Sequence, residues 1–334
     1  MKNVRSLIAG LLALFLLAGC AGLGTPTPTE AVFPTALPSA TPTPGPTATA
    51  APSATPIPPP FPVTVTDGLG NEVTVNAKPV KIVSLTLGTD EIMLDMVGPD
   101  RLLGVTYLAS DATTSNIAAR PELKQIKNTV EANPEQIIGL EPDLVLVGSF
   151  TKPEVIDQIK HAGITVFVVG NFTGIKPTED SITTLGKLVG EPDKAASMVA
   201  DMESKLAEVA GKVGTPATKP RVLYYTSGGY VSGSKTTPDD IITLAGGVNA
   251  AAATLTDWQV INAEQVIAIN PNVVILSPYV KDDEFLKNPA FAGLDAVKNG
   301  KVVAITDAHM SATSQYIVLA VEDVAKLLYP DAFK

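Results

Sequence analysis

A thirteen-residue segment of this chain occurs twice, 129 positions apart. The first copy, residues 133–145, reads Asn-Pro-Glu-Gln-Ile-Ile-Gly-Leu-Glu-Pro-Asp-Leu-Val, and the second, residues 262–274, reads Asn-Ala-Glu-Gln-Val-Ile-Ala-Ile-Asn-Pro-Asn-Val-Val. Six of the thirteen positions are identical. Each copy starts as a short helix and runs into an apolar stretch typical of a buried strand. The repeat predicts two similar α/β lobes that face each other across a cleft, because ligands of open α/β sheets bind beyond the carboxyl ends of the strands.

Short apolar runs alternate with helical patterns from residue 63 to the end of the chain. Several runs are apolar throughout, as expected for parallel strands that are covered on both faces. This alternation predicts an α/β fold. We expect strands at 81–85, 144–147, 165–169, 222–225, 273–276 and 302–305, and helices near 89–97, 134–140, 153–162, 238–245, 263–269 and 314–328.

A longer helix is expected at 193–212, between the two copies of the repeat. Its apolar residues recur every three or four positions and form one stripe on an otherwise charged surface. About 20 residues at 1.5 Å each give a rod of roughly 30 Å, which is about the width of a lobe. We therefore expect an N-terminal lobe at 63–176, a helical connector at 177–214 and a C-terminal lobe at 215–334. The stripe consists of Ala195, Met198, Val199, Met202, Leu206 and Val209.

The N-terminus predicts a lipoprotein signal peptide at 1–19. Two basic residues precede an apolar run that is too short to span a bilayer comfortably, and the run ends in Leu-Ala-Gly followed by Cys20. Cys20 is the only cysteine of the chain, so no disulfide framework is available. Acyl chains on Cys20 would anchor the mature protein to the outer face of a cell membrane.

A linker rich in proline and threonine follows Cys20 and extends to residue 62. Proline (13) and threonine (9) make up 22 of the 42 residues at 21–62. Such a composition cannot bury a core and favours an extended chain. We expect a stalk that tethers the folded lobes to the membrane.

Composition and motifs exclude several classes of protein. The net charge of −10 argues against nucleic acid as a partner, because binding to nucleic acid requires clustered Lys and Arg. The chain carries none of the common nucleophile-elbow, phosphate-loop, zinc-protease or dinucleotide motifs, so we expect no enzymatic activity and no cofactor. Two histidines without a cysteine partner cannot form a His-rich zinc or manganese site. A surface lipoprotein with a sensory or adhesive role remains an alternative.

Residues 63–334 resemble the class of periplasmic binding proteins that deliver iron chelates, haem and vitamin B12 to ATP-driven importers. The resemblance rests on the opening at 63–73, the strand at 81–85, the two Asn-x-Glu-Gln helices, the connector helix and Gly-Gly-Val-Asn at 246–249. It implies two Rossmann-like lobes joined by a single long backbone helix, with small lobe closure. It also implies a monomer that docks on a dimeric permease with its ATPase subunits, through Glu135 on one lobe and Glu264 on the other.

Four aromatic residues on expected loops are the candidates for ligand contacts: Tyr107, Phe150, Tyr230 and Trp258. The regions around Tyr230 and Trp258 resemble the vitamin B12-binding members of the class. Amphipathic rings suit a large, flat, partly apolar ligand. Few cations are expected in the cleft, with Lys235 the one candidate, which favours a corrinoid over an anionic ferric siderophore. Haem is a further alternative, with His309 or Met310 as its axial ligand.

Overall fold

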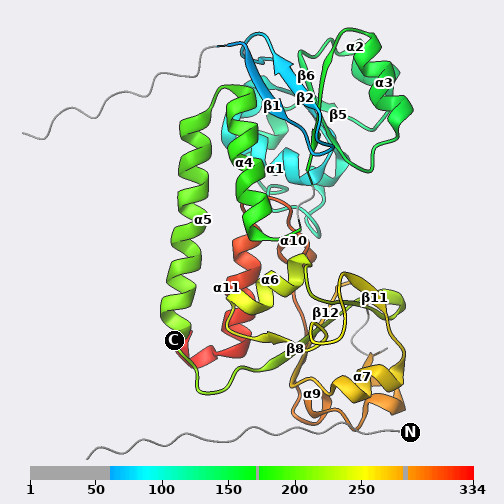
Figure 1. The fold of residues 1–334 in the computed structure, drawn as a ribbon, viewed down its shortest axis with the longest axis vertical. Coiled ribbons are helices and arrows are strands. Elements are labelled where there is room, and N and C mark those ends of the chain that lie inside the picture. Colours follow the sequence, from blue (N-terminus) through cyan, green and yellow to red (C-terminus); the bar gives the residue numbers. More distant parts are fainter. Residues whose placement is uncertain (1–60, 171–172, 281–284) are drawn as a thin grey trace, which may run out of the picture. The chain divides into compact units, whose positions relative to one another are not determined.

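The computed structural model describes residues 61–170, 173–280 and 285–334 (Figure 1). The predicted signal peptide, Cys20 and nearly all of the predicted linker lie outside the described residues. The described part contains two sheets, each built around parallel strands, and a small antiparallel hairpin of β1 (Val63–Thr66) and β2 (Glu72–Val75).

The N-terminal sheet has five parallel strands in the order β5-β4-β3-β6-β7. Its central strands are buried along their whole length, which explains their continuously apolar sequence. The strands are β3 (Ile82–Ser84), β4 (Leu102–Val105), β5 (Asn128–Thr129), β6 (Leu144–Gly148) and β7 (Thr165–Val169). The helices of this lobe are α1 (Leu87–Val97), α2 (Pro134–Gly139) and α3 (Pro153–His161).

The C-terminal sheet repeats this plan with one change. Strands β8, β10, β12 and β13 pair in parallel, whereas β9 pairs antiparallel with both β8 and β11. The strands are β8 (Arg221–Tyr225), β9 (Tyr230–Ser232), β10 (Val248–Asn249), β11 (Trp258–Val260), β12 (Val273–Leu276) and β13 (Val302–Ala304). The helices are α6 (Thr237–Leu244), α7 (Ala263–Ile269), α9 (Asp295–Lys298), α10 (Asp307–Met310) and α11 (Ile317–Leu328).

The sequence repeat is the same structural unit in both lobes. Helix α2 leads into β6 and α7 leads into β12, and β6 and β12 begin 129 residues apart. Within each copy, one side chain anchors the start of the neighbouring strand of the sheet, β3 or β8. The Asp143 carboxylate accepts hydrogen bonds from the backbone N–H groups of Val80 and Lys81, and Asn272 Oδ1 accepts one from the N–H of Arg221. The predicted pair of similar α/β lobes is confirmed.

The long helix α5 (Pro192–Val213) runs along one side of both sheets (Figure 1). Its predicted stripe faces the core, because Ala195, Met198, Met202 and Val209 are buried. Proline occupies its first turn and Gly214 follows its last. Helix α4 (Ile175–Val189) precedes it and packs against it. The predicted fold class, two lobes joined by a long backbone helix, is confirmed, and the boundaries 63–176, 177–214 and 215–334 stay a prediction.

One apolar core extends through both lobes. It contains residues of the N-terminal sheet, such as Leu146, of helix α5 and of the C-terminal sheet, such as Ile275. Polar contacts add to it. Asp240 of α6, for example, accepts a hydrogen bond from the N–H of Ile175 at the start of α4, and Ser314 donates to Glu91 of α1. Since separating the lobes would expose this core, we expect only small closure.

Gly88 of α1 lets the segment at 311–316 approach closely. A Cβ at this position would overlap the Thr313 hydroxyl and stand 2.6 Å from the Thr313 carbonyl oxygen. Gly88→Ala should therefore lower the free energy of unfolding by about 1–3 kcal/mol, as overpacking does. Chemical denaturation would measure the change. Gly211→Ala is the matched control, because a Cβ there meets nothing within 4 Å. The control should stabilise the protein by up to about 1 kcal/mol, and equal effects of both variants would contradict the prediction.

Candidate functional site

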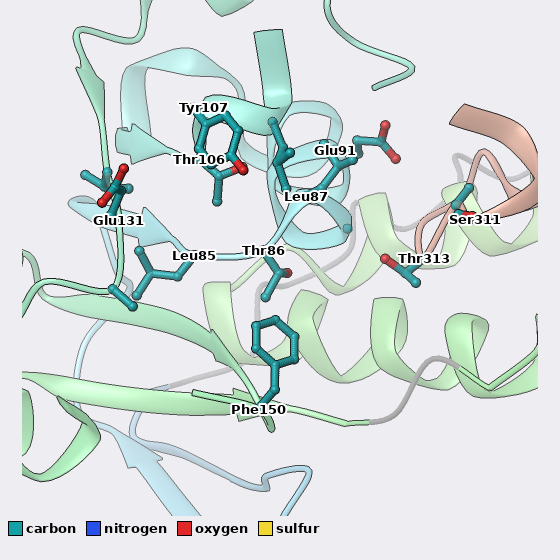
Figure 2. Close-up of a pocket in the computed structure, with 15 residues that line it drawn as sticks. Leu85, Thr86, Leu87, Glu91, Thr106, Tyr107, Glu131, Phe150, Ser311 and Thr313 are labelled. Carbon is teal, nitrogen blue, oxygen red and sulfur yellow. The ribbon is translucent and has the colours of Figure 1, made fainter. Parts of the chain in front are cut away.

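A pocket of about 350 Å³ opens at the carboxyl ends of the N-terminal strands. The loops after β3, β4, β5 and β6 form one wall, and residues 311–313 from the C-terminal part of the chain form the other (Figure 2). This edge is where open α/β sheets bind their ligands. The pocket is lined by Leu85, Thr86, Leu87, Gly88, Glu91, Thr106, Tyr107, Leu108, Val130, Glu131, Ala132, Phe150, Ser311, Ala312 and Thr313.

Two of the four predicted aromatics, Tyr107 and Phe150, line this pocket. Tyr107 starts a short 3-10 helix after β4, and Phe150 lies just beyond β6. The Tyr107 side chain is 61% exposed and that of Phe150 80% exposed. Figure 2 shows the Phe150 ring pointing toward Thr86, with Tyr107 on the far side of that threonine. Gly148 makes room for the ring, because a Cβ there would stand 2.6 Å from Phe150 Cζ.

The other two predicted aromatics, Tyr230 and Trp258, lie in the C-terminal lobe. They share one face of the β9–β11 pair, since Tyr230 is opposite Val260 and Trp258 is opposite Ser232. Neither is among the described residues that line the pocket. The Trp258 ring meets Tyr224 edge-on with 6.0 Å between centroids. The predicted role of Tyr230 and Trp258 in ligand binding stays a prediction.

The sequence analysis missed Tyr279. This side chain is 63% exposed and follows β12 as Phe150 follows β6. The two residues are 129 positions apart, which is the offset of the repeat. Phe150 and Tyr279 are therefore the equivalent aromatics of the two lobes, and the repeat itself carried the signal that could have identified Tyr279.

Asp307, the first residue of α10, organises hydroxyl groups beside the pocket. Its Oδ1 accepts a hydrogen bond of 2.6 Å from Ser311, and its Oδ2 accepts one of 3.2 Å from the Tyr279 hydroxyl. Burial, reinforced by the charge of Asp307, raises the pKa of Tyr224 to about 12. Tyr224 therefore stays a neutral hydroxyl at physiological pH.

Glu91 is a buried acid at the edge of the pocket, only 1% exposed. Its Oε1 accepts hydrogen bonds from the backbone N–H of Asn116 at 2.7 Å and from Asn116 Nδ2 at 3.0 Å, and its Oε2 accepts one from Ser314. Burial raises the pKa of this carboxyl. No sequence signal marked Glu91, because its partners come from segments far away in the chain.

Basic side chains are held away from the pocket. Arg101 donates to Glu191 and to the carbonyls of Pro79 and Val189. Arg120 pairs with Asp95 of α1 and with Glu122 of the 3-10 helix at Pro121–Gln125, and Arg221 donates to the Ile269 carbonyl. Lys235, the predicted cationic contact, is exposed and does not line the pocket. Among the described residues that line the pocket, none is Lys or Arg.

The two predicted docking acids occupy equivalent positions. Glu135 lies in the first turn of α2, where Asn133 caps the helix, and Glu264 lies in the first turn of α7, where Asn262 and Gln265 form a capping box. Both side chains are exposed, and within the described residues neither carboxylate has a hydrogen-bond or ionic partner. Figure 1 shows α2 in the N-terminal lobe and α7 in the C-terminal lobe, both on the side of the molecule opposite α5.

Two α/β lobes on a rigid helix, with a pocket at the strand ends and a C-terminal segment closing it, define a bilobal ligand-binding protein. The chain belongs to the periplasmic binding protein family, whose profile matches residues 82–308. The resemblance predicted from the sequence is therefore confirmed. Members of this family bind solutes for transport and are not enzymes.

Curated relatives agree with this assignment. The chain is 28% identical to the uncharacterized ABC transporter substrate-binding lipoprotein YvrC of Bacillus subtilis, over 82% of this chain and 88% of that protein. It is also 28% identical to a cobalamin-binding protein of Halobacterium salinarum, over 77% of this chain and 72% of that protein. The solved structure of the molybdate-binding protein MolA of Haemophilus influenzae superposes with a TM-score of 0.68 at 21% identity, covering 81% of this chain and 92% of that one, and shares the fold.

Three further observations concern the described residues. No helix among them is long and apolar enough to cross a bilayer. No three His, Cys, Asp or Glu side chains among them gather as a metal-binding group. Neither His309 nor Met310 is among the described residues that line the pocket, and Met310 is buried in the core. Their predicted role as an axial ligand of haem stays a prediction.

Proposed function

We propose that this protein is the lipid-anchored, extracytoplasmic binding subunit of an ATP-driven importer, and that its pocket binds a corrinoid. The observation that carries the choice of ligand is the pocket itself. It combines the exposed rings of Tyr107 and Phe150 with acidic and neutral polar groups, and no described residue that lines it is basic. Such a surface suits a large flat ligand with amide groups along its edge.

The alternatives are less well supported by the same pocket. A ferric siderophore that carries net negative charge, or haem with its two propionates, would place carboxylates near Glu91 and Glu131, and no described residue that lines the pocket is a cation that could pair with them. The name of the Halobacterium salinarum relative, a cobalamin-binding protein, supports the corrinoid. The pocket holds only part of so large a ligand, and the exposed rings of Tyr230 and Trp258 offer further contact area in the other lobe.

The proposed delivery step uses Glu135 and Glu264. Each is exposed, unpaired within the described residues and placed on the same element of its lobe. One acid per lobe matches a permease of two subunits, each presenting a basic group. The binding protein would act as a monomer, tethered through Cys20, and would reach the transporter with its linker at 20–62.

Titration of the full purified chain with cobalamin, haem and a ferric siderophore tests the choice of ligand. We expect a saturable heat and an absorbance change with cobalamin, and an affinity in the micromolar range or tighter, about −8 kcal/mol or more favourable. Phe150→Ala should weaken binding by about tenfold, because it removes a ring that the ligand would bury. Leu244→Ala, which truncates an exposed side chain of α6, is the control and should leave the affinity unchanged. Saturation by a siderophore or haem, with no response to cobalamin, would show that the ligand assignment is wrong.

A further inference from the structure

We propose that Tyr279, Asp307 and Ser311 form the C-terminal half of the ligand site and select ligands whose edge carries hydrogen-bond donors over ligands whose edge carries carboxylates. This inference rests on the proposed function, since it assumes that the ligand occupies the pocket lined by Tyr107 and Phe150. It assigns a role to three side chains that are not among the ligand contacts predicted from the sequence.

The position of Tyr279 is the first argument. Tyr279 and Phe150 follow equivalent strands at the offset of the repeat, and both rings are more than half exposed. A ligand held between the lobes would therefore meet one aromatic from each. The two side chains differ by one hydroxyl group: Phe150 of the N-terminal lobe is a phenyl ring, and Tyr279 of the C-terminal lobe is a phenol. The polar selectivity of the pair must therefore come from the hydroxyl of Tyr279.

The second argument is the direction of the hydrogen bonds. Both the Tyr279 hydroxyl and the Ser311 hydroxyl donate their protons to the Asp307 carboxylate, at 3.2 Å and 2.6 Å. Each hydroxyl then has only lone pairs left for a ligand, and the carboxylate itself can only accept. Ser311 lines the pocket directly. Tyr279, Asp307 and Ser311 thus form an acceptor wall, whose side chains bind N–H groups and repel carboxylates.

The third argument is the charge that faces this wall. Asp111, in the loop after Tyr107, acts electrostatically on the Tyr279 hydroxyl from the N-terminal lobe. Hydrogen bonds from the N–H and hydroxyl of Thr113 hold the pKa of Asp111 below its usual range, so it is charged at neutral pH. Glu131 lines the pocket. A carboxylate on the ligand would face these acids, whereas an amide would gain acceptors.

Two corrinoids with the same macrocycle test the proposal. Dicyanocobinamide carries amides along its edge, and dicyanocobyrinic acid carries carboxylates at the same positions. We expect the full chain to bind the amide by on the order of 100-fold more tightly, because like-charge juxtaposition is strongly unfavourable in a partly buried site. Binding would be measured by calorimetry and by the corrin absorbance.

Variants locate the selectivity. Asp307→Asn supplies an amino group where only acceptors stood, so the preference should fall to about tenfold or less, with the carboxylate form gaining affinity. Tyr279→Phe, which keeps the ring and removes only the hydroxyl, should weaken binding of the amide form by about threefold to tenfold. Asp331→Asn, an exposed acid at the C-terminus, is the matched control and should leave both affinities unchanged.

The outcomes separate the two proposals. Equal affinity of the wild-type chain for both corrinoids, or an unchanged preference in Asp307→Asn, would overturn the selectivity and leave the corrinoid assignment standing. If neither corrinoid binds, the proposed ligand is wrong, and the acceptor wall is then tested with two iron chelates. A cationic hydroxamate chelate such as ferrioxamine B should bind more tightly than ferric citrate, and the reverse order would overturn the inference.

Discussion

Reversing the charge of both docking acids, Glu135→Arg together with Glu264→Arg, should reduce ligand uptake by cells at least about 100-fold. The affinity of the purified protein for its ligand should stay within about twofold of the wild-type value, because changes at exposed sites away from the pocket alter its energetics little. Uptake of a labelled ligand and calorimetry of the purified variant measure the two quantities.

The expected size of the loss of uptake follows from the placement of the two acids. Both carboxylates are exposed and lack partners within the described residues, so reversal breaks no contact there. At the permease, a basic group that the resemblance implies would then face an arginine instead of a carboxylate. Two such like-charge contacts cost several kcal/mol. Each single reversal should give an intermediate loss, since each affects one of the two docking contacts.

Glu154→Arg provides the control for this prediction. Glu154 is also an exposed acid in the first turn of a helix of the N-terminal lobe, but it lies on α3 and outside the repeat. Its reversal changes the net charge by the same amount as one docking variant and should leave uptake intact. If the double variant transports normally, the assignment of Glu135 and Glu264 as docking residues is wrong.

Much of the fold could be predicted because its elements are local patterns. Strands β7 and β12 begin and end where their apolar runs do, and α5 extends one residue beyond the predicted 193–212 at each end. The repeat identified α2 and α7 and the strands that follow them. By contrast, the two-residue strands β5 and β10 carry too few residues for a pattern, and their pairing is decided by neighbours in the sheet.

The site was only partly predictable, because one of its two walls, residues 311–313, comes from a distant part of the chain. Tyr107 and Phe150 directly follow strands, and the rule that ligands bind at strand ends identifies them. Glu91 and Ser314 meet because the chain returns from the C-terminal lobe to α1, more than 200 residues later. Hydrophobic periodicity in the sequence gives no sign of a contact between segments so far apart in the chain. Tyr279 could have been predicted from the sequence, since it is the counterpart of Phe150 at the offset of the repeat.

Asp90→Asn should stabilise the protein above neutral pH by on the order of 4 kcal/mol and have little effect near pH 4. Asp90 of α1 is fully buried, and burial raises its pKa from 3.8 to about 7. Its Oδ2 accepts hydrogen bonds from the N–H and hydroxyl of Thr106 at 3.1 Å and 2.5 Å, while its Oδ1 has no hydrogen-bond partner among the described residues. An asparagine can keep its oxygen on the Thr106 donors and carry no charge.

The sign of the pH dependence follows from proton binding. Between about pH 4 and pH 7 the folded state holds a proton on Asp90 that the unfolded chain has released, so rising pH favours unfolding through this group. The favourable contribution of Asp90 to stability is complete below its pKa in the unfolded chain, and it is lost as the pH rises through its pKa in the folded protein. Asparagine does not titrate, so the variant lacks this loss. The stability difference between variant and wild type should therefore grow from about pH 4 and level off above about pH 8.

Denaturant titrations of the two proteins across this pH range measure the difference. Asp100→Asn, an exposed acid just after α1, is the control and should change the free energy of unfolding by less than about 0.5 kcal/mol at every pH. A difference between Asp90→Asn and wild type that stays constant with pH would show that Asp90 binds no extra proton in the folded state. Because α1 also carries Glu91 at the pocket edge, a confirmed dependence would link the stability of the helix behind the ligand site to the pH outside the membrane.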